Sequence, residues 1–297
     1  MLIASLFMAG CQTNPPDTQE TQTQNTQNQD VSKAEPLYKP TDEEFLSMKD
    51  FIDYLPRAPL KGVKEDGGYF QLSNVDDYTV MQGGCSDGRY MYLILENNQK
   101  DMDIIFKVDM KTWEIVKQSE PLPLHHCNCM GYNSKENVLI VSHNTGAPKD
   151  ISLINPETLE IIETKSLKYG IYGICYNPEK DWYVVGISGS SAFAILDTEF
   201  VELGYYDGHQ IGLANQSISC DSKYIYIGNS GVSVNPGVEV VKLYDWTGEY
   251  KGIFRVDSVS EQEAFIPING KHYITFYTGN GGRLYEINID YSKLAEK

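Results

Sequence analysis

The sequence predicts an all-β fold built from a repeated unit of four short strands. The first observation is a recurring pattern that ends in Asp or Asn, and its successive copies close at Asp87, Asn133, Asn177 and Asp221, which are 46, 44 and 44 residues apart. The second observation is that an apolar or aromatic run of strand length follows each copy within a few residues. Five units of about 45 residues fit a five-bladed β-propeller with four strands in each blade.

The first unit shows how each blade is expected to be built. Its strands are predicted over residues 81–86, 90–95, 104–108 and 114–118. Asp109 begins the turn between the last two, and Asn155, Asp197, Asp245 and Asn288 begin similar turns in the later units. An Asp or Asn side chain accepts hydrogen bonds from backbone amides two residues further on, so these positions favour tight turns.

The fifth unit ends too early to form an outer strand of its own. Residues 282–289 supply its third strand, and little chain follows. The strand-like residues 68–72 precede the first unit, so we expect them to complete the last blade and close the ring. A propeller of six blades is the alternative, if residues 60–80 contain a degenerate blade. The repeats from residue 70 to 290 resemble the broad five-bladed family of bacterial propeller proteins.

The chain before residue 67 divides into three expected parts. Residues 1–10 are apolar and uncharged, residues 11–35 are rich in Gln, Thr and Asn, and residues 36–66 contain a helix and connector before the propeller at 67–297. Thr41 and Glu44 have the spacing of a capping box, and Pro56 ends the predicted helix. The polar part buries too little apolar surface to fold, so it is expected to be a disordered tether.

The segment from Leu6 to Cys11 resembles the lipobox of bacterial lipoproteins. An apolar residue three positions before a cysteine, followed by small residues, is the pattern that matches. Met8 and the lack of a preceding Lys or Arg depart from that pattern, and the true start may lie upstream. The resemblance implies a cleaved signal peptide over 1–10, a palmitate-type acyl anchor on Cys11 and an extracytoplasmic site on the bacterial cell membrane.

Charge and cysteine content narrow the possible partners. The formal charge of −17 opposes binding to nucleic acid, which depends on basic residues that neutralise phosphates. The five cysteines after Cys11 lie in inner-strand segments and are odd in number, which indicates small packing residues more than a disulfide framework. No cofactor is expected.

Polar residues at one register position of the inner strands are the candidate ligand-binding residues. Counting back five from each closing Asp or Asn gives one polar residue per blade, and the fifth blade joins if its strand has a one-residue bulge. The ring consists of Gln82, Asn128, Tyr172, Gln216 and Glu263. Either these residues bind an unknown small molecule, glycan or protein at a channel mouth, or they only hydrogen-bond one another and channel water.

His125, Cys127 and Cys129 form the one local cluster with metal-ligand chemistry. Alternate residues of a strand share a face, so the three are a weak candidate for zinc, against buried thiols near the channel. No metal site is favoured.

The catalytic alternatives depend on carboxylates. A glycoside hydrolase needs two facing carboxylates, and the ring supplies only Glu263. Gln82-Gly83, Tyr172-Gly173 and Glu96 resemble positions of the five-bladed glutaminyl cyclotransferases. The resemblance implies that Glu96 is catalytic, although Glu96 is followed by Asn-Asn-Gln in place of Ser-Thr-Gly; Glu263 is the catalytic candidate of the glycan-processing alternative. The sequence favours a binding module, with a cyclotransferase-like or glycan-processing enzyme as the alternative.

Overall fold

The computed structural model describes residues 52–53, 55–232, 237–258 and 260–294. All of them belong to one compact unit, Lys33–Lys297. The predicted signal peptide, Cys11 and the polar tether lie outside these residues. Of the predicted N-terminal helix, only Ile52, Asp53 and Leu55 are described, and Ile52 and Leu55 are buried. No helix among the described residues is long and apolar enough to cross a membrane.

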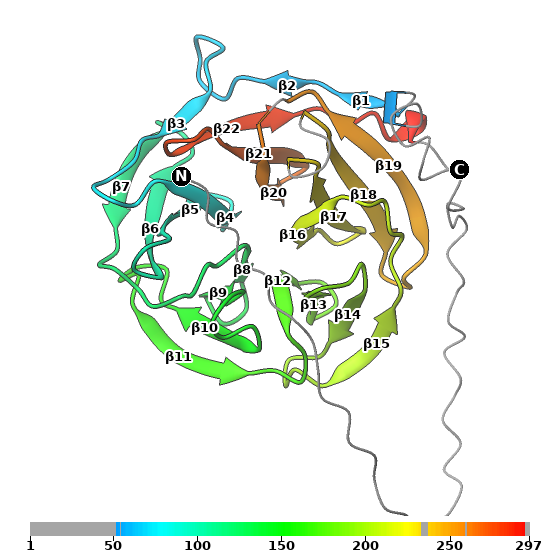
Figure 1. Cartoon of the computed structure of the whole chain (residues 1–297), viewed down its shortest axis with the longest axis horizontal. Helices are drawn as coiled ribbons and strands as arrows, with labels where there is room; N and C mark the ends of the chain where they lie inside the picture. Colours follow the sequence, from blue (N-terminus) through cyan, green and yellow to red (C-terminus); the bar gives the residue numbers. More distant parts are fainter. Residues whose placement is uncertain (1–51, 54, 233–236, 259, 295–297) are drawn as a thin grey trace, which may run out of the picture. The chain divides into compact units, whose positions relative to one another are not determined.

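Five sheets surround a common centre, as the repeat predicts (Figure 1). The strands of blades 1 and 2 are β4 (Val80–Ser86), β5 (Tyr90–Asn97), β6 (Met102–Asp109), β7 (Glu114–Gln118), β8 (Met130–Asn133), β9 (Val138–Ser142), β10 (Asp150–Ile154) and β11 (Ile161–Ser166). Those of blade 3 are β12 (Ile171–Asn177), β13 (Trp182–Ile187), β14 (Phe193–Leu196) and β15 (Glu202–Tyr206). The inner strand of each blade contacts the inner strands of both neighbouring blades, so the ring is closed.

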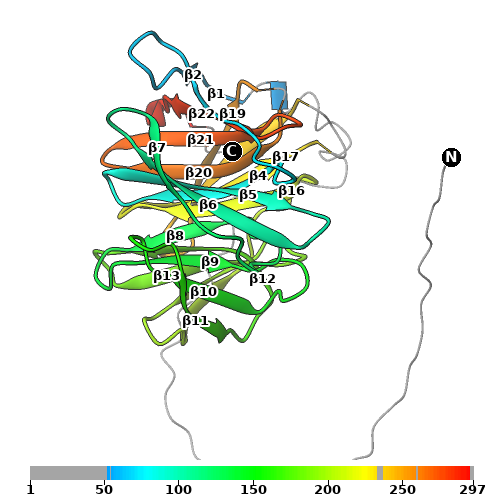
Figure 2. The ribbon, with the colours of Figure 1, turned by 90° about the vertical axis from the view of Figure 1, so that its left-hand side faces the viewer.

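Blades 4 and 5 are completed by the N-terminal strands. Blade 4 contains β16 (Ala214–Cys220), β17 (Tyr224–Ser230), β18 (Glu239–Asp245) and β19 (Tyr250–Val256), and blade 5 contains β20 (Gln262–Ile268), β21 (Lys271–Tyr277) and β22 (Gly282–Ile287). The short strands β1 (Arg57–Ala58), β2 (Leu60–Lys61) and β3 (Phe70–Leu72) run along the outer edge of these two blades (Figures 1 and 2).

The predicted closure of the ring by residues 68–72 is confirmed. Strand β3 pairs antiparallel with β22, and Leu72 lies opposite Gly282 in the register. Strand β2 also pairs with β22, and β1 pairs in parallel with β19. Phe70 and Leu72 are buried against the core between blades 5 and 1. Residues 60–80 therefore complete the fifth blade and do not form a sixth.

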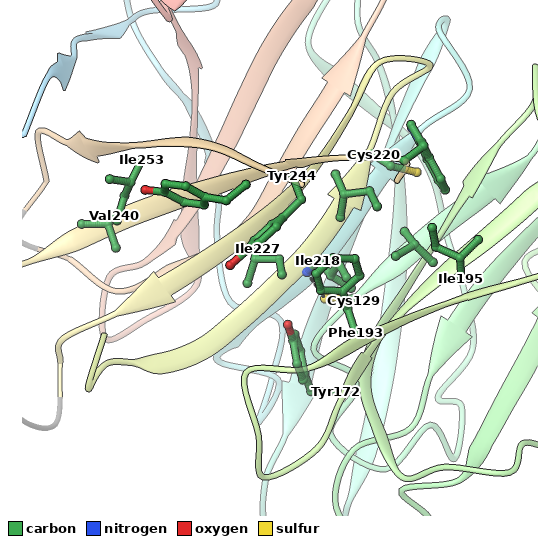
Figure 3. Packing of buried hydrophobic residues seen from close by; sticks show 14 of the residues in the cluster. Cys129, Tyr172, Phe193, Ile195, Ile218, Cys220, Ile227, Val240, Tyr244 and Ile253 are labelled. Carbon is green, nitrogen blue, oxygen red and sulfur yellow. Dashed lines mark hydrogen bonds between the residues drawn. The ribbon is translucent and has the colours of Figure 1, made fainter. Parts of the chain in front are cut away.

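The hydrophobic core is divided among the five blade-to-blade interfaces. One cluster of buried side chains lies at each interface, and Figure 3 shows the cluster between blades 3 and 4, where Phe193 and Ile195 meet Ile218 and Ile227. Strands of blade 1 such as β5 are buried along almost their whole length because each sheet is covered on both faces. The outer strand β7 is exposed at every residue.

The turn residues act as the sequence predicts. The side chain of Asp109 accepts a hydrogen bond of 2.8 Å from the amide of Lys111, and Asn155 accepts one of 2.8 Å from the amide of Glu157. Asp87, which directly follows the inner strand of blade 1, accepts hydrogen bonds from two amides that follow it. These side chains fix the ends of the strands and thereby the register of each blade.

Candidate functional site

Backbone bulges position most of the predicted ring. In blades 3, 4 and 5, the inner strand carries one extra residue opposite its neighbour, and that residue is Tyr172, Gln216 or Glu263. In blade 1, Gln82 and Gly83 together lie opposite a single residue. A β-bulge turns a side chain out of the regular alternation of the strand. The four blades therefore share one backbone feature at the same channel mouth, while Asn128 lies two residues before β8 begins.

Two ring members, Gln82 and Gln216, form side-chain hydrogen bonds to carboxylates outside the ring. Gln82 donates to Glu96 over 3.2 Å, and Gln216 donates to Glu261. Tyr172 packs in the cluster with Cys129 and Ile218 (Figure 3). No hydrogen bond between two ring members is present among the described residues. The mouth is therefore divided into an acidic half and a neutral half.

The acidic half of the mouth contains four carboxyl groups from blades 1, 4 and 5, those of Glu96, Glu239, Glu261 and Glu263. Glu263 is buried, and burial first and then the nearby charges of Glu261, Glu239 and Glu96 raise its pKa well above the usual range. Burial also raises the pKa of Glu239 to about 7, against hydrogen bonds that lower it from Ser230 and the Gln262 amide. A carboxyl with a raised pKa stays protonated near neutral pH and can donate a proton.

Glu96 lies at the centre of a hydrogen-bond network. Its carboxylate is 2.6 Å from Nδ1 of His126, and it also accepts the bond from Gln82. The side-chain amide of Asn98 also faces Glu96, and the orientation that satisfies both groups is the one that places its nitrogen 2.6 Å from both carboxylate oxygens. Burial alone lowers the pKa of His126, but the hydrogen bond and charge of Glu96 and the charge of Asp103 outweigh that effect and raise it. Glu96 is therefore a buried residue of β5 that is held by His126 and Gln82.

Two consecutive histidines are held in a strained backbone conformation beside this network. His125 and His126 both have φ of 56°, a region that side chains larger than glycine seldom occupy. Nδ1 of His125 lies 2.6 Å from Asp101, and His126 is fixed by Glu96. Such strain persists only where surrounding contacts enforce it, and it is concentrated at functional sites.

The neutral half contains a pocket of about 380 Å³ between the loops of blades 2, 3 and 4. Its polar lining residues are Asn128, Asn144, Tyr172, Ser188, Ser190, Ser191, Gln210 and Asn215, and no charged side chain from the described part of the chain lines it. Three buried atoms in this lining have no hydrogen-bond partner among the described residues: Oδ1 of Asn128, the hydroxyl of Tyr172 and Oγ of Ser188. Asn128 and Tyr172 are 6% and 4% exposed.

The three residues of the weak zinc candidate have separate partners. His125 pairs with Asp101, the thiol of Cys127 faces the carboxyl of Asp103, and the thiol of Cys129 contacts the backbone of Gln216 and Ile218. Among the described residues, no group of three His, Cys, Asp or Glu side chains is arranged to hold a metal ion.

Sequence reasoning did not identify His126 and Glu239 as members of this site. His126 follows another histidine two residues before Asn128, so its position ahead of an inner strand was an available signal. Glu239 is the first residue of β18, the third strand of blade 4, and its carboxylate accepts a hydrogen bond from the amide of Gln262 in blade 5. No local pattern marks that approach.

Comparison with known proteins identifies structures of the same fold but does not identify a family. No family model matches the chain, and no curated protein matches it. Among solved structures, a glutaminyl cyclase from Myxococcus xanthus has a TM-score of 0.58 and 13% identity, over 80% of this chain and 98% of that one. A putative exported protein from Bacteroides fragilis has a TM-score of 0.46 and 8% identity, over 75% of this chain and 94% of that one. At this level of identity the likeness to the cyclase shows the shared propeller fold alone.

Proposed function

We propose that the protein binds a small, uncharged molecule rich in hydroxyl or amide groups in the pocket of the neutral half. The observation that carries this proposal is the meeting of three unpartnered buried atoms, from Asn128, Tyr172 and Ser188, in one pocket. A buried polar atom without a partner costs about 1–3 kcal/mol, and a ligand that bonds to it recovers that cost. The pocket volume is at the small end of the range for ligand sites.

The chemistry of the lining defines the ligand class. Amide and hydroxyl groups both donate and accept hydrogen bonds, and the described lining residues are all uncharged, which disfavours an ionic ligand in this pocket. Neutral sugars, N-acetylated sugars and capped short peptides satisfy these conditions.

The test is a thermal-shift screen of residues 36–297 against neutral sugars, N-acetylated sugars, capped peptides and matched charged compounds, followed by calorimetry of any hit. A ligand at 100 times its Kd stabilises the folded state by about 2.7 kcal/mol. Asn128→Ala should weaken binding of a hit, whereas Ser222→Ala, at the opposite mouth, should leave it unchanged. Hits that are confined to charged compounds, or that are insensitive to Asn128→Ala, would contradict the proposal.

A second candidate function is a cyclotransferase-like reaction at the acidic half, supported by the convergence of Glu96, Glu239 and Glu261 around Glu263. In this reaction the amino group of an N-terminal glutamine attacks its own side-chain carboxamide. A C–N bond forms in the ring, the bond to ammonia breaks, and one proton passes from the attacking to the leaving nitrogen. A carboxylate such as Glu96 would accept that proton, and a protonated carboxyl such as Glu263 would donate one.

The enzymatic candidate has its own assay. Peptides that begin with glutamine are incubated with the protein, and ammonia release and the matching mass loss are measured. Activity that disappears in Glu263→Gln and persists in Tyr172→Phe would favour the acidic half as the reacting centre. Absence of ammonia release from a folded protein at several pH values would leave binding as the supported function.

The location that we propose is the outer face of the bacterial cell membrane, with the propeller attached through acylated Cys11. The proposal is supported by the lipobox-like residues 6–11 and the polar segment that follows them. Replacing Cys11 with Ala should move the protein from the membrane to the soluble fraction. If the variant stays in the membrane fraction, the lipid anchor is excluded.

A further inference from the structure

Two thiols from neighbouring blades lie in contact near the opposite mouth of the channel. The sulfur of Cys220 is 2.9 Å from the sulfur of Cys175, and the two residues belong to β16 and β12. These inner strands are adjacent in the ring but belong to different sheets, so backbone pairing does not hold the thiols together. A disulfide has a sulfur–sulfur length of about 2.05 Å, so less than about 1 Å of further approach would close one.

The pair can be reached from outside. Cys175 and Cys220 line a pocket of about 500 Å³ to which all five inner strands contribute. Cys175 is half-buried and Cys220 is buried, so Cys175 is the thiol that a reagent meets first. Figure 3 shows Cys220 at the edge of the core cluster between blades 3 and 4, beyond Ile218. A third thiol, Cys85, lines the same pocket.

We propose that Cys175 and Cys220 form a redox pair that a small disulfide oxidises to an intramolecular disulfide between blades 3 and 4. The thiolate of Cys175 attacks one sulfur of the small disulfide, the disulfide bond breaks, and one thiolate leaves. The thiolate of Cys220 then attacks the sulfur of Cys175 and displaces the second thiolate. The two cysteines lose two protons and two electrons, and the small disulfide is reduced to two thiols.

The environment of the two thiols sets the order of these steps. Burial, and then contact with Cys175, raises the pKa of Cys220 well above the usual range, so this thiol is a poor first nucleophile. Once Cys175 carries the mixed disulfide, Cys220 lies within contact distance of the sulfur that it must attack. Short contact therefore compensates for low thiolate content in the second step.

The test uses the folded propeller with 2-hydroxyethyl disulfide, a small uncharged oxidant. After incubation, remaining thiols are blocked, and peptide mapping without reduction identifies the cysteines that have reacted. We expect the protein to lose two hydrogen masses and to give one linked peptide pair that contains Cys175 and Cys220. The link closes a loop of about 45 residues and should raise Tm by roughly 5–15 °C, reversibly on reduction.

Two variants separate the steps. Cys220→Ser should stop the reaction at a mixed disulfide on Cys175, and Cys85→Ser should still form the link. The proposal is overturned if the wild-type protein keeps both thiols, if it stops at a stable mixed disulfide on Cys175, or if the link involves Cys85. Because the wild-type peptide map decides between these outcomes, the test does not depend on whether a serine variant folds.

Discussion

Removal of one oxygen atom from the core should make the protein more stable. The hydroxyl of Tyr172 is buried without a hydrogen-bond partner among the described residues, and burial raises its pKa well above the usual range. Tyr172→Phe removes a desolvated group and leaves the ring packing in place. The gain should be about 1–2 kcal/mol in the free energy of unfolding, which corresponds to about 2–8 °C in Tm for a domain of this size.

A matched substitution in the same blade should have the opposite sign. Tyr183 is 2% exposed, and its hydroxyl accepts a bond of 2.6 Å from Nδ2 of Asn133. Tyr183→Phe should therefore destabilise the protein by about 1–3 kcal/mol. Both variants are measured by urea denaturation and thermal melting without ligand. A loss of stability in Tyr172→Phe as large as in Tyr183→Phe would show that the Tyr172 hydroxyl has a partner, and the argument for a ligand pocket would fail.

Three further changes test the closure of the ring, the buried carboxyl of Asp103 beside Glu96 and His126, and the pocket. Leu72→Ala should lower the free energy of unfolding by about 2–5 kcal/mol because Leu72 is buried at the closing strand. The control Val116→Ala, on an exposed outer strand, should change it by less than about 0.5 kcal/mol, and chemical denaturation measures both variants. Burial raises the pKa of Asp103 to about 7, so the folded state holds an extra proton between about pH 4 and 7 and loses stability as pH rises through that window. The free energy of unfolding at pH 5 minus that at pH 8 should be about 2–4 kcal/mol smaller in Asp103→Asn than in the wild-type protein. An unchanged difference would refute the raised pKa of Asp103. A Cβ at Gly186 would lie 2.2 Å from the Tyr172 ring, so Gly186→Ala should abolish binding of any pocket ligand in calorimetry, while Gly170→Ala, with 3.7 Å of clearance, should not.

The blades were predictable because their signal is repeated along the chain. The spacing from Asp87 to Asp221 gave the number and order of the sheets, and the short fifth unit indicated that residues 68–72 would complete it. Each of these inferences uses many residues, so one residue that departs from the repeat pattern does not change the prediction. Strand limits were accurate to about two residues for the same reason.

The site was less predictable because single contacts between blades decide it. The ring positions were found from a common register, but the partners of Gln82 and Gln216 come from a neighbouring strand and a neighbouring blade. The contact between Cys175 and Cys220 was hidden because one lies two residues and the other one residue before its closing Asn or Asp. An alignment of the repeats therefore places the two thiols one position apart, although their sulfur atoms lie 2.9 Å from each other.

The pairing of β3 with β22 also constrains how the protein reaches its native state. Gln71 and Gly282 bond across 211 residues of chain, so the last blade is incomplete until nearly all of the sequence is available. Contacts between distant residues form slowly because the intervening loop must close first, although each doubling of its length adds only about 0.6 kcal/mol. Ring closure should therefore be a late, cooperative step. A chain cut short within blade 5 would keep four blades with two open edges, and such edges favour aggregation over function.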